Sequence, residues 1–422
     1  MLLRFGVANH LSIRDYQELS FATSSLKDRR EGLIDCEATP NGSVLPAVVI
    51  YGPNASGKSN FVDAVGAMRS MVLWSQIKGE PDGGVPRSPF RLDSVSSNTS
   101  SCFDIDFVID GVRHHYGFET SARVFETEWL YAFPKSHQRT LFERDRGKFH
   151  FGRGLRGQNN SIAGLTRPNS LYLSAAAQNG HEYLSKIYGF FRSILGVQDI
   201  DVPDVAASAQ TTEKGGVDQR VINFLKKINT GVTGYRRKET ELSEEERTVH
   251  REFIAMVKRI AGTRGDVEID DDEKRVTFEL AHRGRNNEDV YLDLGQESAG
   301  TRRLLIVLSA ACHALDGGLP LCVDELDASL HTQASEAILE LFCMPENNPK
   351  GAQLIATTHD TNLLESPMLR RDQVWFTEKD PEGATELYPL TDIRTRRGDN
   401  IQRGYLQGRY GSVPLTGISL NP

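Results

Sequence analysis

The chain has 422 residues, of which 39% are hydrophobic and 25% charged, as is ordinary for a soluble globular protein of two or three domains. Its formal net charge of −8 argues against a dedicated nucleic-acid binder, so any contact with DNA would come from a local patch. No apolar stretch reaches the length of a membrane span and the five cysteines have no metal-binding spacing, so we expect a cytoplasmic protein without membrane contact.

The first part of the chain is predicted to consist mainly of strands around one helix. Residues 2–21 alternate between apolar and polar side chains, which predicts two short strands. A buried strand at 47–51 precedes a helix over 58–71, and residues 78–101, rich in Gly, Pro and Ser, predict a loop. A hairpin turn is predicted at Asp110, where the dipeptide DG occurs. Antiparallel strands are predicted at 102–107, 113–118 and 126–133.

The middle of the chain changes to helical spacing. Apolar residues recur every three or four positions, which predicts helices over 183–195, 217–228 and 243–260. We interpret this region as a small helical insertion, and the absence of sustained heptads excludes a long coiled coil. The basic run Arg236-Arg237-Lys238 inside it is predicted to be a solvated loop.

Strands and helices alternate in the last part of the chain. Strands at 275–281 and 290–294 are followed by a helix over 298–315 and a strand over 319–324. The next helix and strand are predicted at 332–342 and 353–358. This alternation predicts an α/β fold with a parallel sheet covered by helices.

A phosphate-binding loop is the clearest motif of the sequence. It matches G-x-x-x-x-G-K-[ST] and lies between a predicted strand and a predicted helix, as the motif requires. Backbone N–H groups and the helix start would face the phosphates of ATP. We expect Lys58 to reach the β- and γ-phosphates and Ser59 to hold Mg²⁺. The residues predicted to bind ATP are Gly52, Asn54, Gly57, Lys58, Ser59 and Asn60.

A second motif places two carboxylates at the end of an apolar strand. Residues 319–323 lead directly into Asp324 and Glu325. We expect Asp324 to support the Mg²⁺ shell and Glu325 to polarise the attacking water as a general base. An apolar strand that ends in acidic residues is common, so this interpretation depends on the phosphate-binding loop.

A third motif, at the start of the helix predicted over 298–315, narrows the class of protein. Leu294-Gly-Gln-Glu-Ser298-Ala-Gly300-Thr301-Arg302 resembles the signature motif of ABC-type ATPases, which caps the γ-phosphate held by the opposite protomer. A serine at a helix start offers an anion its hydroxyl, unpaired N–H groups and the helix dipole, although a plain N-cap serine shares these features. The resemblance implies that Ser298, Gly300 and Thr301 act in trans. Gln296 precedes the serine, which is SMC-like rather than transporter-like.

Three further segments resemble the same class. Asp327-Ala-Ser329 resembles the D-loop, which crosses the dimer interface, and His359 resembles the switch histidine that senses the γ-phosphate. Residues 5–14 resemble the opening strand and turn of SMC-like ATPases. A Q-loop glutamine is not evident, because Gln76 lies too close to the phosphate-binding loop.

The resemblance extends to a narrower family. Leu171-Tyr-Leu-Ser174 and the tail at 405–414 look like those of ATP-binding proteins of bacterial abortive-infection and anti-phage systems, which are related to the ATPase half of the OLD nucleases. It implies an ABC-type ATPase head: a parallel P-loop sheet flanked by helices, an antiparallel β subdomain and an inserted helical subdomain. The corresponding domains are an N-terminal lobe at 1–180, the insertion at 181–265 and a C-terminal lobe at 266–422.

The resemblance also implies a function. ATP and Mg²⁺ would be the cofactors, and two protomers would form a homodimer around ATP, within a higher oligomer in some cases. The ATPase would control an effector nuclease or toxin encoded nearby. Two alternatives stay open, namely a DNA-repair or chromosome-handling ATPase that clamps DNA, and a slow-turnover, nucleotide-gated scaffold or sensor.

Overall fold

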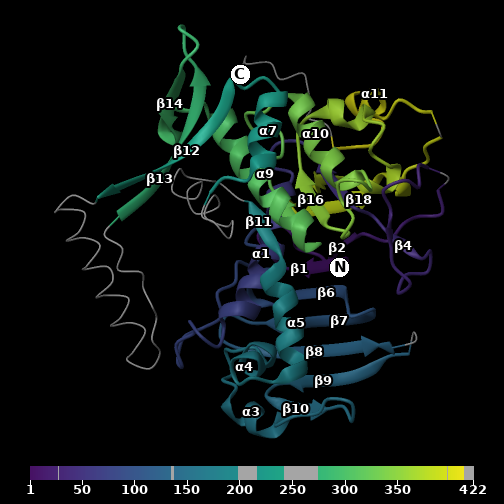
Figure 1. Cartoon of the computed structure of the whole chain (residues 1–422). Coiled ribbons are helices and arrows are strands. Elements are labelled where there is room, and N and C mark those ends of the chain that lie inside the picture. The colour runs from purple at the N-terminus through teal and green to yellow at the C-terminus, as the bar shows by residue number, and fades with distance from the viewer. Residues whose placement is uncertain (27, 135–136, 198–215, 242–273, 397, 413–422) are drawn as a thin grey trace, which may run out of the picture. The chain divides into compact units, whose positions relative to one another are not determined.

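The computed structural model describes the chain except for residues 27, 135–136, 198–215, 242–273, 397 and 413–422 (Figure 1). The chain divides into two compact units, formed by residues 1–199 with 313–422 and by residues 200–312. The helix predicted over 243–260 lies outside the described residues. None of the described helices is long and apolar enough to cross a membrane.

A six-stranded sheet in the first unit carries most of the predicted motifs. Its strands follow the order β11-β15-β16-β5-β17-β18, and all but β18 run parallel. Three of them, β5, β15 and β16, are buried along their whole length, as is typical of a parallel sheet with both faces covered. The bounds are β5 Ala47–Tyr51, β11 Leu195–Val197, β15 Pro320–Val323, β16 Gln353–Thr357, β17 Val374–Lys379 and β18 Thr385–Pro389.

The strand order brings the motifs to one place. The strands predicted at 47–51, 319–324 and 353–358 are β5, β15 and β16, and β16 lies between the other two. Because the carboxyl ends of parallel strands meet at one edge of a sheet, the loops after these strands share that edge. The predicted α/β fold with a parallel P-loop sheet is therefore confirmed.

An antiparallel sheet of seven strands also belongs to the first unit, in the order β10-β9-β8-β7-β6-β1-β2. Asp110 and Gly111 form the predicted hairpin turn, with φ angles of 50° and 73° that suit a type I′ turn. Strands β9 and β10 extend the sheet beyond the predicted strands. The bounds are β1 Leu2–Ala8, β2 Gln17–Ser20, β6 Ser101–Ile109, β7 Val112–Thr120, β8 Phe125–Phe133, β9 Arg139–Asp145 and β10 Lys148–Phe151, while β3 Ile34–Asp35 and β4 Ser43–Val44 form a separate ribbon.

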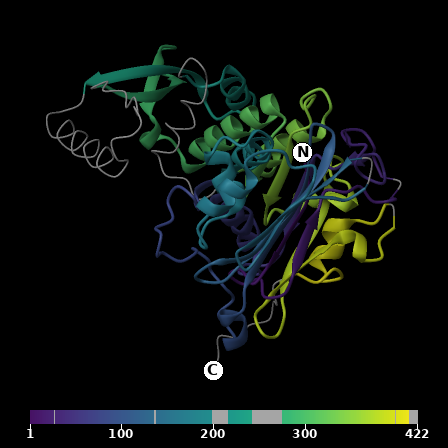
Figure 2. The same cartoon turned by 90° about the horizontal axis from the view of Figure 1, so that it is seen from below.

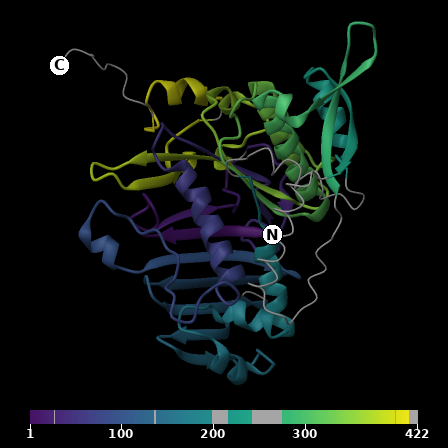
Figure 3. The same ribbon diagram turned by 90° about the vertical axis from the view of Figure 1, so that its left-hand side faces the viewer.

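Helices of the first unit cover one face of the antiparallel sheet (Figure 2). These helices are α1 Lys58–Trp74, α3 Asn159–Leu165, α4 Tyr172–Gln178 and α5 Glu182–Ser193, which pack against one another. The other helices of the unit are α2 Ser94–Asn98, α10 Thr332–Cys343, which contacts β5 of the parallel sheet, and α11 Ile401–Leu406. Phe190 of α5 stacks on Phe107 of β6 with 4.3 Å between the ring centroids. Helix α1 packs against α5 (Figure 3). It places Phe61 edge to face against Phe5 of β1, with 5.4 Å between the ring centroids. Helix α1, which follows the predicted phosphate-binding loop, is thus anchored in the same core as the antiparallel sheet.

Helix α7 (Gln219–Lys227) and a three-stranded antiparallel sheet are described in the second unit, together with the start of α9 (Ala299–Gly317). The strands are β12 Val232–Glu241, β13 Lys274–Arg283 and β14 Asp289–Asp293. The predicted loop at Arg236-Arg237-Lys238 is wrong, because the run lies in β12. Arg236 and Lys238 both form ion pairs with the buried carboxylate of Glu279 in β13. Cross-strand pairing stabilises this basic run as a strand.

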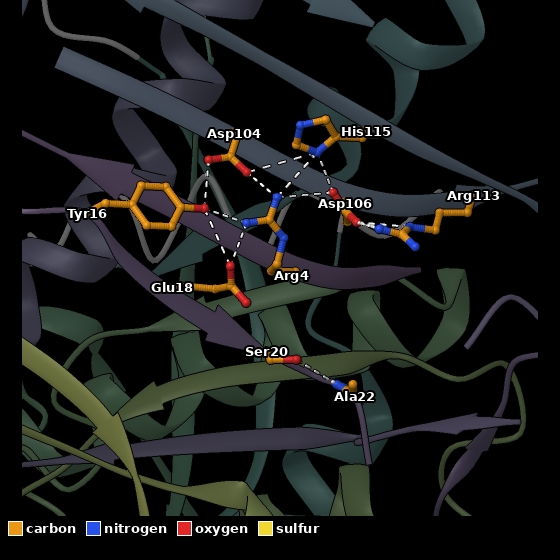
Figure 4. A network of polar contacts seen from close by, with 9 residues as sticks. All are labelled: Arg4, Tyr16, Glu18, Ser20, Ala22, Asp104, Asp106, Arg113 and His115. Carbon is orange, nitrogen blue, oxygen red and sulfur yellow. Dashed lines mark hydrogen bonds and ion pairs between the residues drawn. The ribbon is translucent and has the colours of Figure 1, made fainter. Parts of the chain in front are cut away.

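A cluster of charged side chains occupies the other face of the antiparallel sheet (Figure 4). Arg4 of β1 donates a hydrogen bond to Asp104 of β6 and lies 3.3 Å from Asp106. Asp106 also accepts from Arg113 and is bonded to His115, both in β7. Asp104 and Asp106 are only 5% and 3% exposed, so these buried carboxylates depend on their cationic partners.

Asp106→Asn should make the stability of the protein less sensitive to acid. Burial by itself raises the pKa of Asp106, but the hydrogen bond from His115 and two arginine charges outweigh it and lower the pKa to about 2. A carboxyl group with a pKa lowered by folding stabilises the folded state above its unfolded pKa of about 4 and loses that contribution as the pH falls toward about 2. The contribution is about 2 kcal/mol.

The measurement is the free energy of unfolding in urea, followed from about pH 5 to about pH 2. Asp110→Asn is the matched control, because it removes an exposed carboxylate at a hairpin tip. The control should keep the acid slope of the wild type, whereas Asp106→Asn should flatten it. Equal slopes in all three proteins would show that Asp106 is not held ionised by the cluster.

Candidate nucleotide site

The predicted phosphate-binding loop lies between β5 and α1. Gly52 and Gly57 adopt φ angles of 159° and 108°. A Cβ atom at Gly57 would collide with Thr385 and Ser12, and one at Gly52 would lie 2.6 Å from a backbone oxygen of β17. Both positions therefore require glycine. Helix α1 begins directly after the loop, at Lys58, so its free N–H groups lie at the loop, where an anion is favoured.

The ammonium group of Lys58 lies inside this loop. Its Nζ donates to the carbonyl oxygens of Gly52 at 2.8 Å and Pro53 at 3.1 Å, and the side chain is buried. Burial lowers the pKa of Lys58 to about 8, although the carboxylates of Asp324 and two further acidic residues act in the opposite direction. The loop thus holds a poorly solvated cation, for which a phosphate oxygen is a strong partner.

The other predicted ATP-binding residues differ in their surroundings. Ser59 in the first turn of α1 and Asn54 in the loop are both exposed. Asn60 instead donates from Nδ2 to Ser12 Oγ at 2.5 Å, so its side chain joins α1 to the turn between β1 and β2. The hydroxyl of Ser59 and the carboxylate of Asp324 are oxygen donors of the kind that the Mg²⁺ of an ATP complex takes.

Hydroxyl groups from β17 and β18 support the loop from behind. Thr377 Oγ1 lies 2.6 Å from Ser56 Oγ, and Thr385 Oγ1 donates to Ser56 O at 2.8 Å and lies 2.7 Å from Ser12 Oγ. Ser56, Thr377 and Thr385 are all buried. The two threonines are 321 and 329 residues from Ser56 in the sequence and belong to no motif, so sequence reasoning missed them.

The two predicted acidic residues follow β15 directly. Thr357 of β16 donates from Oγ1 to Asp324 Oδ1 at 2.5 Å and accepts the N–H of Glu325 at 2.7 Å. Glu325 is exposed and has a left-handed φ of 49°, whereas Asp324 is half-buried. Both carboxylates lie at the shared sheet edge, where their charges act on Lys58.

Asp327 and His359 meet at the same edge. Asp327 Oδ1 accepts from Thr358 Oγ1 at 2.7 Å and from the N–H of His359 at 3.1 Å. Burial lowers the pKa of His359, and the charge of Lys58 lowers it further, while the nearby carboxylates oppose both effects. The histidine therefore lies within electrostatic reach of the phosphate-binding loop. Ser329, in the same turn as Asp327, is exposed and has a φ of 60°.

The predicted signature residues lie in the second unit, at the start of α9. Ser298 Oγ accepts the N–H of Thr301 at 3.0 Å and lies 2.9 Å from Thr301 Oγ1. Ser298 is therefore an N-cap residue. It is also exposed, whereas Gly300 is half-buried and Thr301 is buried. An exposed helix start with a capping serine can still meet an anion from another molecule.

The two segments behind the narrower resemblance have structural roles in the described part of the chain. Tyr172 and Leu173 begin α4 and donate their N–H groups to the buried carboxylate of Glu128, at 2.6 Å and 3.0 Å. In the tail, Tyr405 of α11 stacks on Phe376 of β17 with 5.4 Å between the ring centroids. The last two residues of the tail motif, 413 and 414, lie outside the described residues.

Comparison with known proteins identifies the family of the chain. Residues 47–365, more than half of the chain, match the family described as "AAA domain, putative AbiEii toxin, Type IV TA system". Among solved structures, the chain is similar to an Smc head bound to the C-winged helix domain of ScpA, with 11% identity over 92% of this chain and 96% of that chain and a TM-score of 0.38. It is also similar to the ATP-binding cassette MJ0796, in a dimeric post-hydrolysis state bound to ADP and Pi, with 13% identity over 93% and 100% of the two chains and a TM-score of 0.30. No curated protein sequence matches the chain. The chain belongs to this family of AAA domains, as the resemblance of its motifs predicts.

Proposed function

We propose that the chain is an ATPase that hydrolyses ATP to ADP and phosphate as a dimer with two ATP molecules between its protomers. The observation that carries this proposal is the shared edge of the parallel sheet. There the buried cation of Lys58 lies within electrostatic reach of Asp324, Glu325 and His359. Phosphoryl transfer to water needs such a set, because catalysis depends on positioning and on stabilising charge. Mg²⁺, bound with ATP, would neutralise part of the phosphate charge.

Each site is composite in this proposal. Glu325 is the general base, His359 senses the γ-phosphate, the signature residues come from the other protomer, and the D-loop crosses the interface between the two. The exposure of Ser298 at a helix start supports this arrangement, since a γ-phosphate held by a second copy could reach it. One protomer supplies Gly52, Asn54, Gly57, Lys58, Ser59, Asn60, Asp324, Glu325 and His359, and the other supplies Ser298, Gly300 and Thr301. The D-loop residues Asp327 and Ser329 lie where the two protomers meet.

Ser298→Asp tests the composite site, because it should abolish ATP-driven association and leave the protomer stable. Aspartate caps a helix as well as serine does, so α9 keeps its cap. Its negative charge, however, would face the γ-phosphate of the partner's ATP. Ser298→Asn is the matched control, since it keeps both the cap and the neutral charge.

Light scattering with and without Mg²⁺-ATP gives the mass of each variant, and thermal unfolding without nucleotide gives its stability. We expect the asparagine variant to associate and the aspartate variant to stay monomeric, with closely similar unfolding midpoints. An aspartate variant that assembles and turns over like the wild type would show that Ser298 is an N-cap residue and no more.

The output that we propose is control of a partner effector, a nuclease or toxin, in anti-phage defence. The family description, which names a toxin and a Type IV TA system, supports a partner of this kind. A DNA clamp has less support, because the chain is acidic overall and Glu279 neutralises much of the basic run in β12. Co-expression with the products of neighbouring reading frames, followed by ATP-dependent co-purification, tests the effector. Binding of the ATP-bound dimer to duplex DNA and to no such product would favour the clamp.

A further inference from the structure

Thr357, the last residue of β16, contacts three consecutive residues after β15. Its hydroxyl donates to Asp324 Oδ1 at 2.5 Å and accepts the N–H of Glu325 at 2.7 Å. Its carbonyl oxygen accepts the N–H of Leu326 at 2.8 Å. The side chain is fully buried. One residue thus fixes one carboxylate of the nucleotide site and the backbone that carries the other.

The sheet register places Thr357 at this point. Strands β15 and β16 pair as far as Val323 and Ala356, so Thr357 extends one residue beyond the end of β15. On its other side it still pairs with Ile50 of β5, the strand that leads into the phosphate-binding loop. Thr357 is therefore held by the sheet where the chain after β15 turns away, and this turn includes the left-handed residue Glu325. A non-glycine residue keeps such a conformation only when its surroundings impose it.

We propose that Thr357 is a positioning residue for ATP hydrolysis, and this inference rests on the proposed function. Its hydroxyl orients the Asp324 carboxylate toward the Mg²⁺ of bound ATP and holds the Glu325 backbone so that the side chain faces the attacking water. The single hydroxyl proton goes to Asp324, and a lone pair accepts from Glu325, so both bonds form at once. A hydrogen-bond donor beside a carboxylate that ligates a metal fixes the orientation of that carboxylate.

Thr358 provides a contrast one residue further on. Its hydroxyl is equally buried and equally bonded, because it donates to Asp327 Oδ1 at 2.7 Å and accepts the N–H of Asp360 at 3.0 Å. Neither of these two bonds of its hydroxyl involves Asp324 or Glu325. Loss of either hydroxyl removes two partly buried hydrogen bonds, so the two losses should affect stability alike. They should differ in their effect on metal-dependent binding.

The experiment compares Thr357→Val, Thr357→Ser and Thr358→Val in the full chain. Valine keeps the shape of threonine without the hydroxyl, and serine keeps the hydroxyl without the methyl group. Calorimetry measures the affinity for ATP once in Mg²⁺ and once in EDTA, and phosphate release gives kcat and KM. We expect Thr357→Val to lose about 10–100-fold in affinity in Mg²⁺ and a similar factor in kcat, with its affinity in EDTA unchanged. Thr357→Ser should recover most of both losses, and Thr358→Val should keep the wild-type ratio of the two affinities.

Two results would overturn the proposal. One is the same Mg²⁺-to-EDTA ratio of affinities in Thr357→Val and the wild type, and the other is an equal defect in Thr357→Ser and Thr357→Val, which would identify the methyl packing as the cause. Thr357→Ala takes the place of the valine variant if that variant unfolds at the assay temperature, with the same expected loss. A wild type that neither binds nor hydrolyses ATP would instead refute the proposed function, and this is established before any variant is compared.

Discussion

Glu325→Gln should lower ATP turnover about 10²–10⁴-fold while ATP stays bound, because an amide keeps the shape of the side chain but cannot accept a proton from water. The bond to the Thr357 hydroxyl is donated by the backbone N–H of Glu325, so the substitution of the side chain leaves it in place. The left-handed turn at this residue should also persist. The expected loss is therefore one of proton acceptance and not of geometry. Without hydrolysis, ATP should hold the proposed dimer together.

The measurements are phosphate release at saturating ATP and the mass of the protein in light scattering with Mg²⁺-ATP. Glu340→Gln is the matched control, since Glu340 is an exposed residue near the end of α10 and the substitution makes the same change of charge away from the sheet edge. It should turn over and dissociate like the wild type. Normal turnover in Glu325→Gln would show that another group accepts the proton from the attacking water.

The parts of the fold that local patterns determine could be predicted from the sequence. Strand β5 and the start of α1 lie where predicted, because a continuous apolar run leads into a loop motif whose glycines and lysine fix the boundary residue by residue. Strands β15 and β16 follow for the same reason, since parallel strands buried on both faces are uninterrupted apolar segments. The motif residues after these strands could be grouped because all three strands end at one edge.

The features that sequence reasoning missed depend on distant partners. The charged residues Arg236 and Lys238 of β12 are typical of a loop when read locally. They form a strand with a partner, Glu279, that lies 43 and 41 residues away in the sequence. Thr377 of β17 and Thr385 of β18 belong to no motif. They support the loop only because Gly52 and Gly57 allow its backbone to lie against them. Thr357 lies two residues before the predicted switch histidine His359, but its role depends on the register between β15 and β16, which no local pattern shows. None of these relations is a pattern within a short window of sequence.

Lys58→Met should abolish ATP binding without destabilising the nucleotide-free protein. Methionine keeps the length and the apolar stem of the side chain and removes the ammonium group. In the nucleotide-free loop this group is bonded only to the carbonyl oxygens of Gly52 and Pro53 among the contacts described, and burial lowers its pKa to about 8. Burial therefore works against the charged form, and the relief of this desolvation cost should offset the loss of the two hydrogen bonds to these carbonyl oxygens.

Binding is expected to respond in the opposite way. A hydrogen bond between charged partners contributes about 1.5–3 kcal/mol, and each 1.4 kcal/mol changes an equilibrium tenfold, so losing one such bond alone weakens ATP binding up to about 10²-fold. The loss should be larger here, because Asp324, Glu325 and Asp327 would then face the phosphates without the cation that offsets them. Calorimetry with ATP, with and without Mg²⁺, measures the affinity, and thermal unfolding without nucleotide measures the stability. Lys78→Met is the control, since Lys78 is an exposed lysine just beyond the other end of α1, where it lies over the ring of Trp74, and its loss should leave ATP binding intact. Wild-type affinity in Lys58→Met would mean that the loop between β5 and α1 does not hold the phosphates. Lost affinity together with an unchanged or higher unfolding midpoint would show that this buried cation serves ligand binding and does not stabilise the fold.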